Sequence, residues 1–201
     1  REELAALRRS ELGLALLAGF FLALHVALWI TSLAFTSVAS SVVLVSTAPL
    51  WVALIAPLTL KETLSRAMLI GMLMALAGGV IVAASDVCLW DGGRFICPPA
   101  QEFLSGRAFL GDLLALGGAL SVAGYLLIVR GLRSGVSLLS YIFLVYGMAA
   151  LALVLAVGAA GLPMFGFSPL TYFWMLALAL VPQLIGHTTY NWALAYLSAA
   201  F

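Results

Sequence analysis

The chain has 201 residues, of which 65% are hydrophobic and 8% are charged, and its formal net charge is +1. So few charges cannot cover a water-soluble fold, in which about a quarter of the residues are usually charged. The small net charge provides no basic field for nucleic acid. Apolar runs of roughly 20 residues match the thickness of a bilayer, and they lack the strict alternation of barrel strands. We therefore predict an all-α protein, a polytopic membrane helix bundle.

Six apolar runs predict six membrane spans, preceded by a charged segment over residues 1–11. Their expected bounds are 12–35, 38–60, 66–85, 108–129, 138–160 and 169–196. Ser65 is the expected N-cap of the third helix, because a serine hydroxyl accepts a hydrogen bond from the free amides of a first helical turn. The longest polar loop, 86–107, separates the third span from the fourth.

The basic residues between the spans predict the orientation in the membrane. Two of them, Arg94 and Arg107, fall on one side, and seven fall on the other: Arg1, Arg8, Arg9, Lys61, Arg66, Arg130 and Arg133. The side that is richer in Lys and Arg usually faces the cytoplasm. The Lys61-Glu62 loop is therefore expected in the cytoplasm and the loop Asp86 to Arg107 outside it. The expected location is the plasma membrane, which in a prokaryote is the inner membrane.

This orientation bears on the two cysteines, Cys88 and Cys97, because disulfides persist outside the cytoplasm. We predict a bridge between them that closes the loop, with two free thiols as the alternative. A metal site is not expected there, because the sequence contains no Cys and His cluster of the kind that binds zinc.

Polar residues at membrane depth are functional candidates by default. In the first span, His25, Trp29 and Ser32 share one helix face. In the sixth span, a polar stripe with a spacing of four residues consists of Gln183, His187 and Asn191, and Tyr190 flanks it. Such groups must face protein or a water-filled cavity. We predict that these residues line a substrate cavity; hydrogen bonding between helices is the alternative.

Prolines within spans remove a backbone donor and tend to kink the helix. Pro49 follows Ser46-Thr47 at mid-membrane depth, and Pro182 lies near the middle of the sixth span. Both are hinge candidates, with static kinks as the alternative. No catalytic constellation is found: the two histidines lack a third ligand for catalytic zinc, and no GxxxxGK[ST] loop is present. Neither a metal nor a cofactor is expected.

The order of these features resembles the EamA-type family of the drug/metabolite transporter superfamily. The matching features are the break Thr36 to Ser40, the mid-helix Pro49, the Leu-x-Glu-x-Leu loop at Leu60 to Leu64, and the Gly-rich stretch Gly71 to Gly79. A second copy is found in GDLLALGGALSVAGYLLIVRGL from Gly111 and GHTTYNWALAYLSAA from Gly186. The chain departs from the family at Lys61-Glu62, where a Gly-Glu pair is usual.

The resemblance implies a protein of ten helices built from two inverted five-helix repeats, of which this chain holds helices three to eight. Residues 1–86 are then part of the first repeat, 87–107 an extracytoplasmic loop, and 108–201 part of the second repeat. LAFTSVA at residues 33–39 is echoed by LAYLSAA at residues 194–200. The charge count places the two on opposite sides of the membrane, as inverted repeats require.

The implied function is secondary transport, as an exporter of a small organic metabolite, amino acid or drug by alternating access. The expected partners are this solute and the lipid bilayer, without nucleic acid, and a monomer is the simplest oligomeric state. Two alternatives are a membrane enzyme that uses His25 and His187, and a membrane scaffold that transports nothing.

Overall fold

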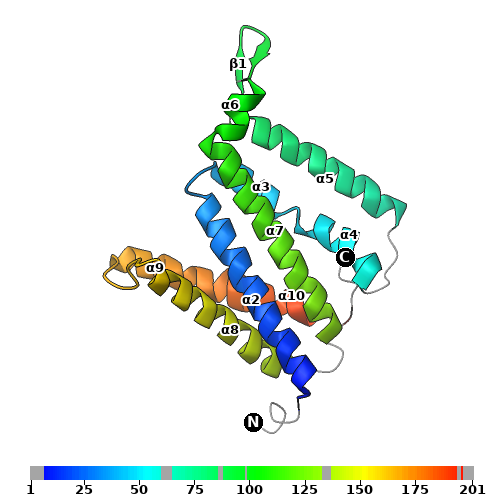
Figure 1. The fold of residues 1–201 in the computed structure, drawn as a ribbon, viewed down its shortest axis with the longest axis vertical. Coiled ribbons are helices and arrows are strands. Elements are labelled where there is room, and N and C mark those ends of the chain that lie inside the picture. Colours follow the sequence, from blue (N-terminus) through cyan, green and yellow to red (C-terminus); the bar gives the residue numbers. More distant parts are fainter. Residues whose placement is uncertain are drawn as a thin grey trace. The chain divides into compact units, whose positions relative to one another are not determined.

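Helices form most of the computed structural model, which describes residues 7–59, 65–85, 88–97, 99–132, 137–193 and 196 (Figure 1). In these ranges, five helical segments are long and apolar enough to cross a membrane: Arg9–Ser32, Val38–Thr59, Arg107–Leu132, Leu138–Ala159 and Pro169–Ala193. A sixth apolar helix, α5 (Arg66–Ser85), has 20 residues, or about 30 Å of helix. The protein is an all-α, polytopic membrane helix bundle, as predicted.

Serine side chains cap several of these helices. Ser65 accepts a hydrogen bond from the amide of Met68 over 3.2 Å, so the expected cap of α5 is present. Ser37 caps α3 (Val38–Val45), and Ser137 caps α8 (Leu138–Ala159), each by accepting from the amide three residues later. These caps satisfy amides that the first turn leaves without an intrahelical partner.

The first and second spans differ from their predicted extents. α2 (Arg9–Ser32) ends three residues before the expected limit, and a turn leads to Ser37, the cap of the next helix. The second span is not one helix, since α3 ends at Val45 and α4 (Ala48–Thr59) begins after a break at Ser46 and Thr47. Pro49 supplies a reason: it has no amide hydrogen with which to continue the helical ladder.

The sixth span contains a π-helical segment that the sequence does not predict. α9 (Pro169–Leu178) leads into η1 (Ala179–His187), and α10 (Thr188–Ala193) follows. Pro182 lies inside η1 and cannot donate the hydrogen bond that an α-helix would require at this position. Nine π-helical residues are unusual, because π-helix occurs mostly as single turns and is frequent at functional sites.

The polar loop after α5 contains secondary structure where the sequence predicts none. Strands β1 (Leu89–Asp91) and β2 (Arg94–Ile96) form an antiparallel hairpin in which Asp91 is opposite Arg94. Its turn, Gly92-Gly93, has φ values of 55° and 84°, and glycine adopts such positive values without steric cost. Cys88 and Cys97 flank the strands and form a disulfide. The short helix α6 (Ala100–Ser105) leads to α7 (Arg107–Leu132).

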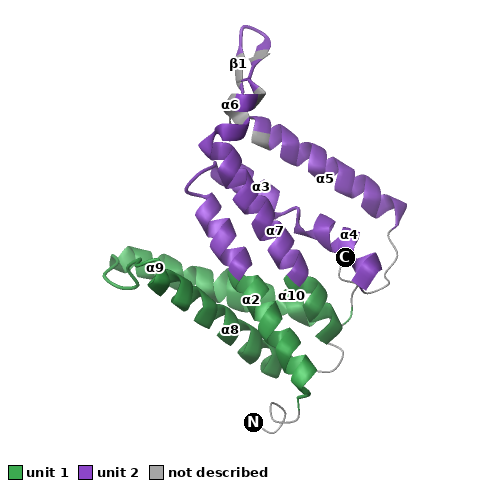
Figure 2. Cartoon of the chain, in the orientation of Figure 1, with its two compact units in different colours: residues 1–23, 125–199, 201 green, residues 24–124, 200 purple. Residues whose placement is uncertain are grey.

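The chain forms two compact units, coloured separately in Figure 2. Unit 1 comprises residues 1–23, 125–199 and 201, and unit 2 comprises residues 24–124 and 200. In unit 1, α2 approaches α8 so closely that a Cβ atom on Gly19 would lie 2.6 Å from the carbonyl oxygen of Val145. Unit 2 has a core of small and branched side chains, among them Val52, Ala115 and Ala119. The repeat boundaries expected from the sequence stay a prediction.

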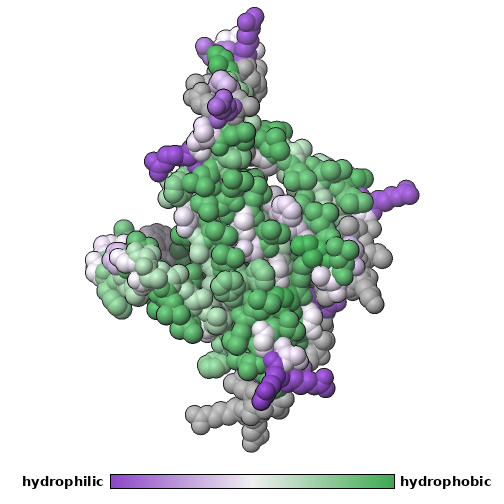
Figure 3. Space-filling view, in the orientation of Figure 1, coloured by the Kyte–Doolittle hydropathy of each residue, from purple (hydrophilic) through white to green (hydrophobic). Residues whose placement is uncertain are grey.

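Large apolar side chains cover much of the surface, as the green areas of Figure 3 show. Leu58 on α4, Leu139 on α8 and Phe165 after α8 are each more than 80% exposed. A soluble monomer rarely exposes continuous apolar surface on this scale, whereas a bilayer covers it at no cost. The polar residues that matter for function are therefore those turned away from lipid.

Candidate functional site

His25 is buried in unit 2 and links α2 to α7. Its Nδ1 atom lies 2.9 Å from the carbonyl oxygen of Gly118. Because a carbonyl only accepts hydrogen bonds, Nδ1 must carry the proton, and Nε2 is an acceptor in the neutral ring. Trp29 stacks on this ring one turn later, with ring centroids 5.8 Å apart and planes at 21°. α7 packs closely on this part of α2, since a Cβ atom on Gly118 would contact the backbone of His25 and Trp29 at 3.4 Å.

Ser32 makes two hydrogen bonds, one within α2 and one that joins α2 to α3. Its hydroxyl donates to the carbonyl oxygen of Trp29 over 2.6 Å, and its oxygen lies 2.6 Å from the hydroxyl oxygen of Ser41. A hydroxyl has one proton, so Ser41 is the donor in the second bond. Ser32 is fully buried. Its geometry favours the alternative of hydrogen bonding between helices, and its role in substrate binding stays a prediction.

Asn191 is the most buried residue of the polar stripe in the sixth span, with no exposed surface. Tyr125 on α7 donates to its Oδ1 atom over 2.8 Å, and its Nδ2 atom donates to the hydroxyl of Tyr146 on α8 over 3.2 Å. One amide thus connects α7, α8 and α10 within unit 1. The sequence analysis selected Asn191 by its spacing, but it selected neither tyrosine.

The two other residues of this stripe and the flanking Tyr190 are less buried than Asn191. His187 ends η1 and is half-buried, with its ring centroid 6.3 Å from that of Tyr125. Gln183 is also half-buried, and Tyr190 is 37% exposed. The spacing of four describes one face of an α-helix, whereas the bonds of η1 span five residues. The stripe is therefore less regular than the sequence predicts.

The seven predicted cavity residues are divided between the two units. His25, Trp29 and Ser32 belong to unit 2, while Gln183, His187, Tyr190 and Asn191 belong to unit 1. A single cavity lined by all seven stays a prediction. Among the residues that the structure describes, no three His, Cys, Asp or Glu side chains are grouped as a metal site would require.

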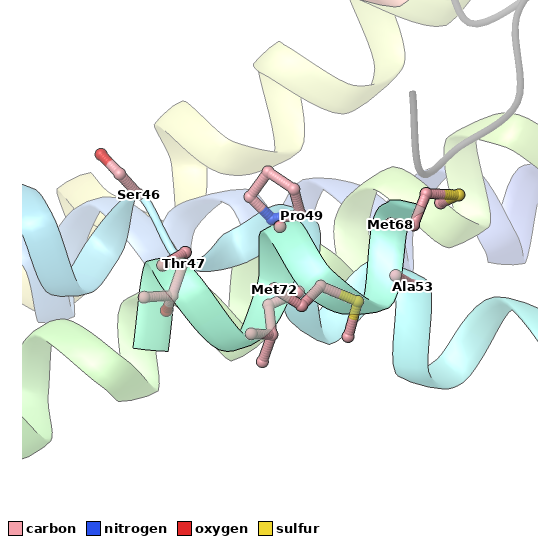
Figure 4. Close-up of a pocket in the computed structure, with 9 residues that line it drawn as sticks. Ser46, Thr47, Pro49, Ala53, Met68 and Met72 are labelled. Atoms are coloured by element: carbon pink, nitrogen blue, oxygen red, sulfur yellow. The ribbon is translucent and has the colours of Figure 1, made fainter. Parts of the chain in front are cut away.

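A pocket of about 230 Å³ opens beside the broken second span (Figure 4). Residues of the break and α4 form one wall, and residues of α5 form the other. The lining residues are Ser46, Thr47, Pro49, Leu50, Ala53, Met68, Gly71, Met72 and Ala75. The sequence pointed to this place through Ser46, Thr47 and Pro49, but it could not predict which helix packs against them.

Thr47 occupies the centre of the break and is 5% exposed. Its hydroxyl donates to the carbonyl oxygen of Leu44 over 2.6 Å and accepts from the indole nitrogen of Trp51 over 3.3 Å. The side chain thus adds a hydrogen bond to a carbonyl that also accepts from the backbone amide of Thr47 over 3.1 Å, and irregular backbone at membrane depth must be satisfied within the protein. A polar, irregular backbone is held between two helix segments, next to a pocket.

A second pocket of about 200 Å³, here called the Asp112 pocket, lies farther along α5. Its lining residues are Leu44, Thr47, Leu76, Gly79, Val80, Phe109, Asp112, Leu113 and Leu116. Asp112 is 6% exposed, and Thr36 donates to its Oδ1 atom over 2.8 Å. α7 begins at Arg107, so Asp112 lies in its second turn. The sequence did contain a signal for this site, because an acidic residue within an apolar span is a candidate functional residue.

Comparison with known proteins identifies the family of the first part of the chain. Residues 2–84 match the EamA-like transporter family. No curated protein and no solved structure matches the chain. The matched range contains α2, the broken second span and most of α5, and the family predicted from the sequence motifs is confirmed. The similarity to this family extends over residues 2–84, which is less than half of the chain.

Proposed function

We propose that the protein is a secondary transporter that exports a small organic solute, such as a metabolite, amino acid or drug, by alternating access. The observation that carries the proposal is the break at Ser46 and Thr47, in the part of the chain that belongs to a transporter family. A multi-pass membrane protein does not need such a break for anchoring. In transporters, discontinuous helices near the midplane commonly form the substrate site.

The local chemistry of the break supports this role. Non-helical backbone at membrane depth persists where it is buried in protein or lines a cavity, and here it lines the pocket beside α5. Alternating access also requires helix segments that move separately. Pro49 at the break and Pro182 in η1 are the hinge candidates, each at an interruption of a span.

The proposed orientation places the Lys61-Glu62 loop in the cytoplasm of the plasma membrane and the disulfide-bonded hairpin outside. It is supported by the excess of Lys and Arg on the first side. The proposal assigns no enzymatic step to the protein. The cavity candidates remain part of the proposal: His25, Trp29 and Ser32 from the first span, and Gln183, His187, Tyr190 and Asn191 from the sixth.

Flux across proteoliposomes tests the proposal, with labelled amino acids, amines and drug-like solutes as the panel. Thr47→Val keeps the shape of the side chain and removes the hydroxyl that bridges the break. Thr59→Val is the matched control, because the Thr59 hydroxyl also donates to a carbonyl of its own helix, over 3.1 Å to Ile55, but at an exposed position.

We expect the unaltered protein to move at least one solute of the panel, with Thr47→Val slower by about tenfold, the loss that one strong buried hydrogen bond implies, and Thr59→Val unchanged. A panel without any flux contradicts the proposal and favours a scaffold. Chemical conversion of a solute during incubation favours a membrane enzyme instead. An equal effect of both variants on flux would show that the break has no specific role in transport.

A further inference from the structure

We propose that the Asp112 pocket binds a small organic cation, with the ammonium group at the Asp112 carboxylate and a hydrocarbon body along the apolar wall. This inference rests on the proposed transport function for its biological meaning, and it narrows the solute class to amines. It concerns a site within unit 2.

The lining of the pocket provides the charge argument. Of its nine residues, only Asp112 and Thr47 carry polar side chains, and the others are apolar. A carboxylate in an apolar wall attracts positive charge and repels anions, and hydrogen bonds to it from a charged donor are among the strongest in proteins. The ring of Phe109 lines the same pocket, and an aromatic face adds attraction for a cation.

Thr36 prepares the carboxylate for this role. Its hydroxyl donates to Oδ1 over 2.8 Å and thereby orients Asp112. A hydroxyl is neutral, so this particular bond brings no positive charge to the carboxylate. Close packing fixes the arrangement further, because a Cβ atom on Gly111 would lie 2.7 Å from the backbone nitrogen of Thr36. The carboxylate is therefore held where the turn before α3 packs closely against α7.

The size of the pocket limits the cation. Its volume of about 200 Å³ is below the range of about 300–1,000 Å³ that is usual for drug-sized ligands. The site therefore fits a small amine with a compact hydrocarbon group. Gly79 contributes to the available space, since a Cβ atom there would make ordinary contact with Leu44 at 3.7 Å.

The Asp112 pocket is also connected to the helix break. Thr47 lines both pockets, and α5 lines the first with residues 68–75 and the second with residues 76–80. The two pockets thus follow one another along α5 and meet at Thr47. A cation released from Asp112 would next encounter the hydroxyl of Thr47 and the irregular backbone of the break. Thr47 would then belong both to the binding site and to the path that the cation follows.

Calorimetric titration of the purified protein with phenethylamine tests the proposal, with 2-phenylethanol as the neutral analogue and 3-phenylpropionate as the anionic analogue. Asp112→Asn removes the charge and keeps an oxygen that can accept from Thr36. Asp91→Asn is the control, because it makes the same charge change at an exposed position of the hairpin. Gly79→Ala reduces the pocket by one methyl group without altering charge.

We expect phenethylamine to bind at least about tenfold more tightly than either analogue, a ratio typical of losing a charged hydrogen bond. Asp112→Asn should remove this preference, Asp91→Asn should retain it, and Gly79→Ala should weaken phenethylamine more than methylamine. Equal binding of the amine and the alcohol overturns the proposal, as does unchanged amine affinity in Asp112→Asn. If Asp112→Asn does not fold, Gly79→Ala decides: unchanged phenethylamine affinity would then overturn the site.

The flux panel separates this proposal from the proposed function. If neutral or anionic solutes are transported while amines neither bind nor move, the transporter proposal stands and the amine site is wrong. If amines bind in a manner that requires Asp112 but no solute crosses the membrane, the site stands and the transport proposal is wrong.

Discussion

Tyr125 donates a hydrogen bond to Oδ1 of Asn191 over 2.8 Å, and both side chains are completely buried. They are 66 residues apart in the sequence, on α7 and α10 of unit 1. The Nδ2 atom of Asn191 in turn donates a hydrogen bond to the hydroxyl of Tyr146 on α8. Asn191 thus uses both the oxygen and the nitrogen of its amide, and these bonds fix the orientation of three helices. The loss of either partner would leave a polar group of Asn191 unpaired in an apolar interior.

Asn191→Ala should therefore destabilise the protein by more than Tyr125→Phe. We expect about 1–3 kcal/mol for the alanine variant, which removes the hydrogen bonds between Asn191 and two tyrosine hydroxyls, and about 0.6–1.7 kcal/mol for the loss of the bond to Asn191 in Tyr125→Phe. The free energy of unfolding in mixed micelles measures both. Tyr190→Phe is the control, since Tyr190 is 37% exposed and should change little.

A double variant completes this test. If the two side chains interact directly, Tyr125→Phe should cost less in the background of Asn191→Ala than in the unaltered protein. Strictly additive free energies would show that the bond contributes nothing to stability.

Gly111→Ala should be among the most damaging glycine substitutions in α7. The added Cβ atom would lie 2.7 Å from both the Cβ atom and the backbone nitrogen of Thr36, so the backbone would have to move. Overpacking of this kind typically costs about 1–3 kcal/mol. Gly147→Ala on α8 is the control, because no atom lies within 4 Å of its added Cβ, and it should be neutral or stabilising. Thermal unfolding of the two variants, compared side by side, checks the difference; equal midpoints would contradict it.

Sequence reasoning predicted the helices well because hydrophobic length is a strong signal. The predicted third span, 66–85, agrees with α5 at both ends, and the serine cap at Ser65 is present. It failed where the backbone departs from regular helix. The interruption at Ser46 and Thr47 and the π-helix around Pro182 are decided by which carbonyls find partners in the folded protein, and apolar composition does not encode this.

The candidate site was predicted less completely than the helices. Polarity at membrane depth identified Asn191 and His25, which are both buried and hydrogen-bonded. Asp112 was not among the predicted site residues, because its pocket depends on α3 and α5 packing against α7, a tertiary relationship. The hairpin at residues 89–96 was also missed, since its strands have three residues each and little periodicity.

Cysteine labelling tests the orientation and the disulfide together. In intact cells, a membrane-impermeant maleimide should not label the native protein, because Cys88 and Cys97 are bonded to each other. It should label the Cys97→Ser variant at Cys88 from outside. Ser10→Cys, in a background without the native cysteines, should react only after the membrane is permeabilised, because Ser10 lies beside the basic residues Arg8 and Arg9.

The reverse pattern, in which Ser10→Cys reacts in intact cells and Cys88 does not, would invert the proposed orientation. Labelling of the native protein without a reducing agent would instead contradict the disulfide. The two conclusions are independent, since the first depends on membrane side and the second on the state of the thiols.

Pro182→Ala should stabilise the sixth span and slow transport. Alanine restores a backbone donor inside η1, which permits an α-helical bond to the carbonyl of Leu178 and favours α-helix over π-helix by part of the roughly 3 kcal/mol that proline costs in a helix interior. Pro57→Ala within α4 is the control, because Pro57 lies in an α-helical segment and is not a hinge candidate. Unfolding stability and flux, measured on both variants, should change in opposite directions for Pro182→Ala only. If flux is retained in Pro182→Ala, the π-helical segment is a static feature of packing and not a moving part of the transporter.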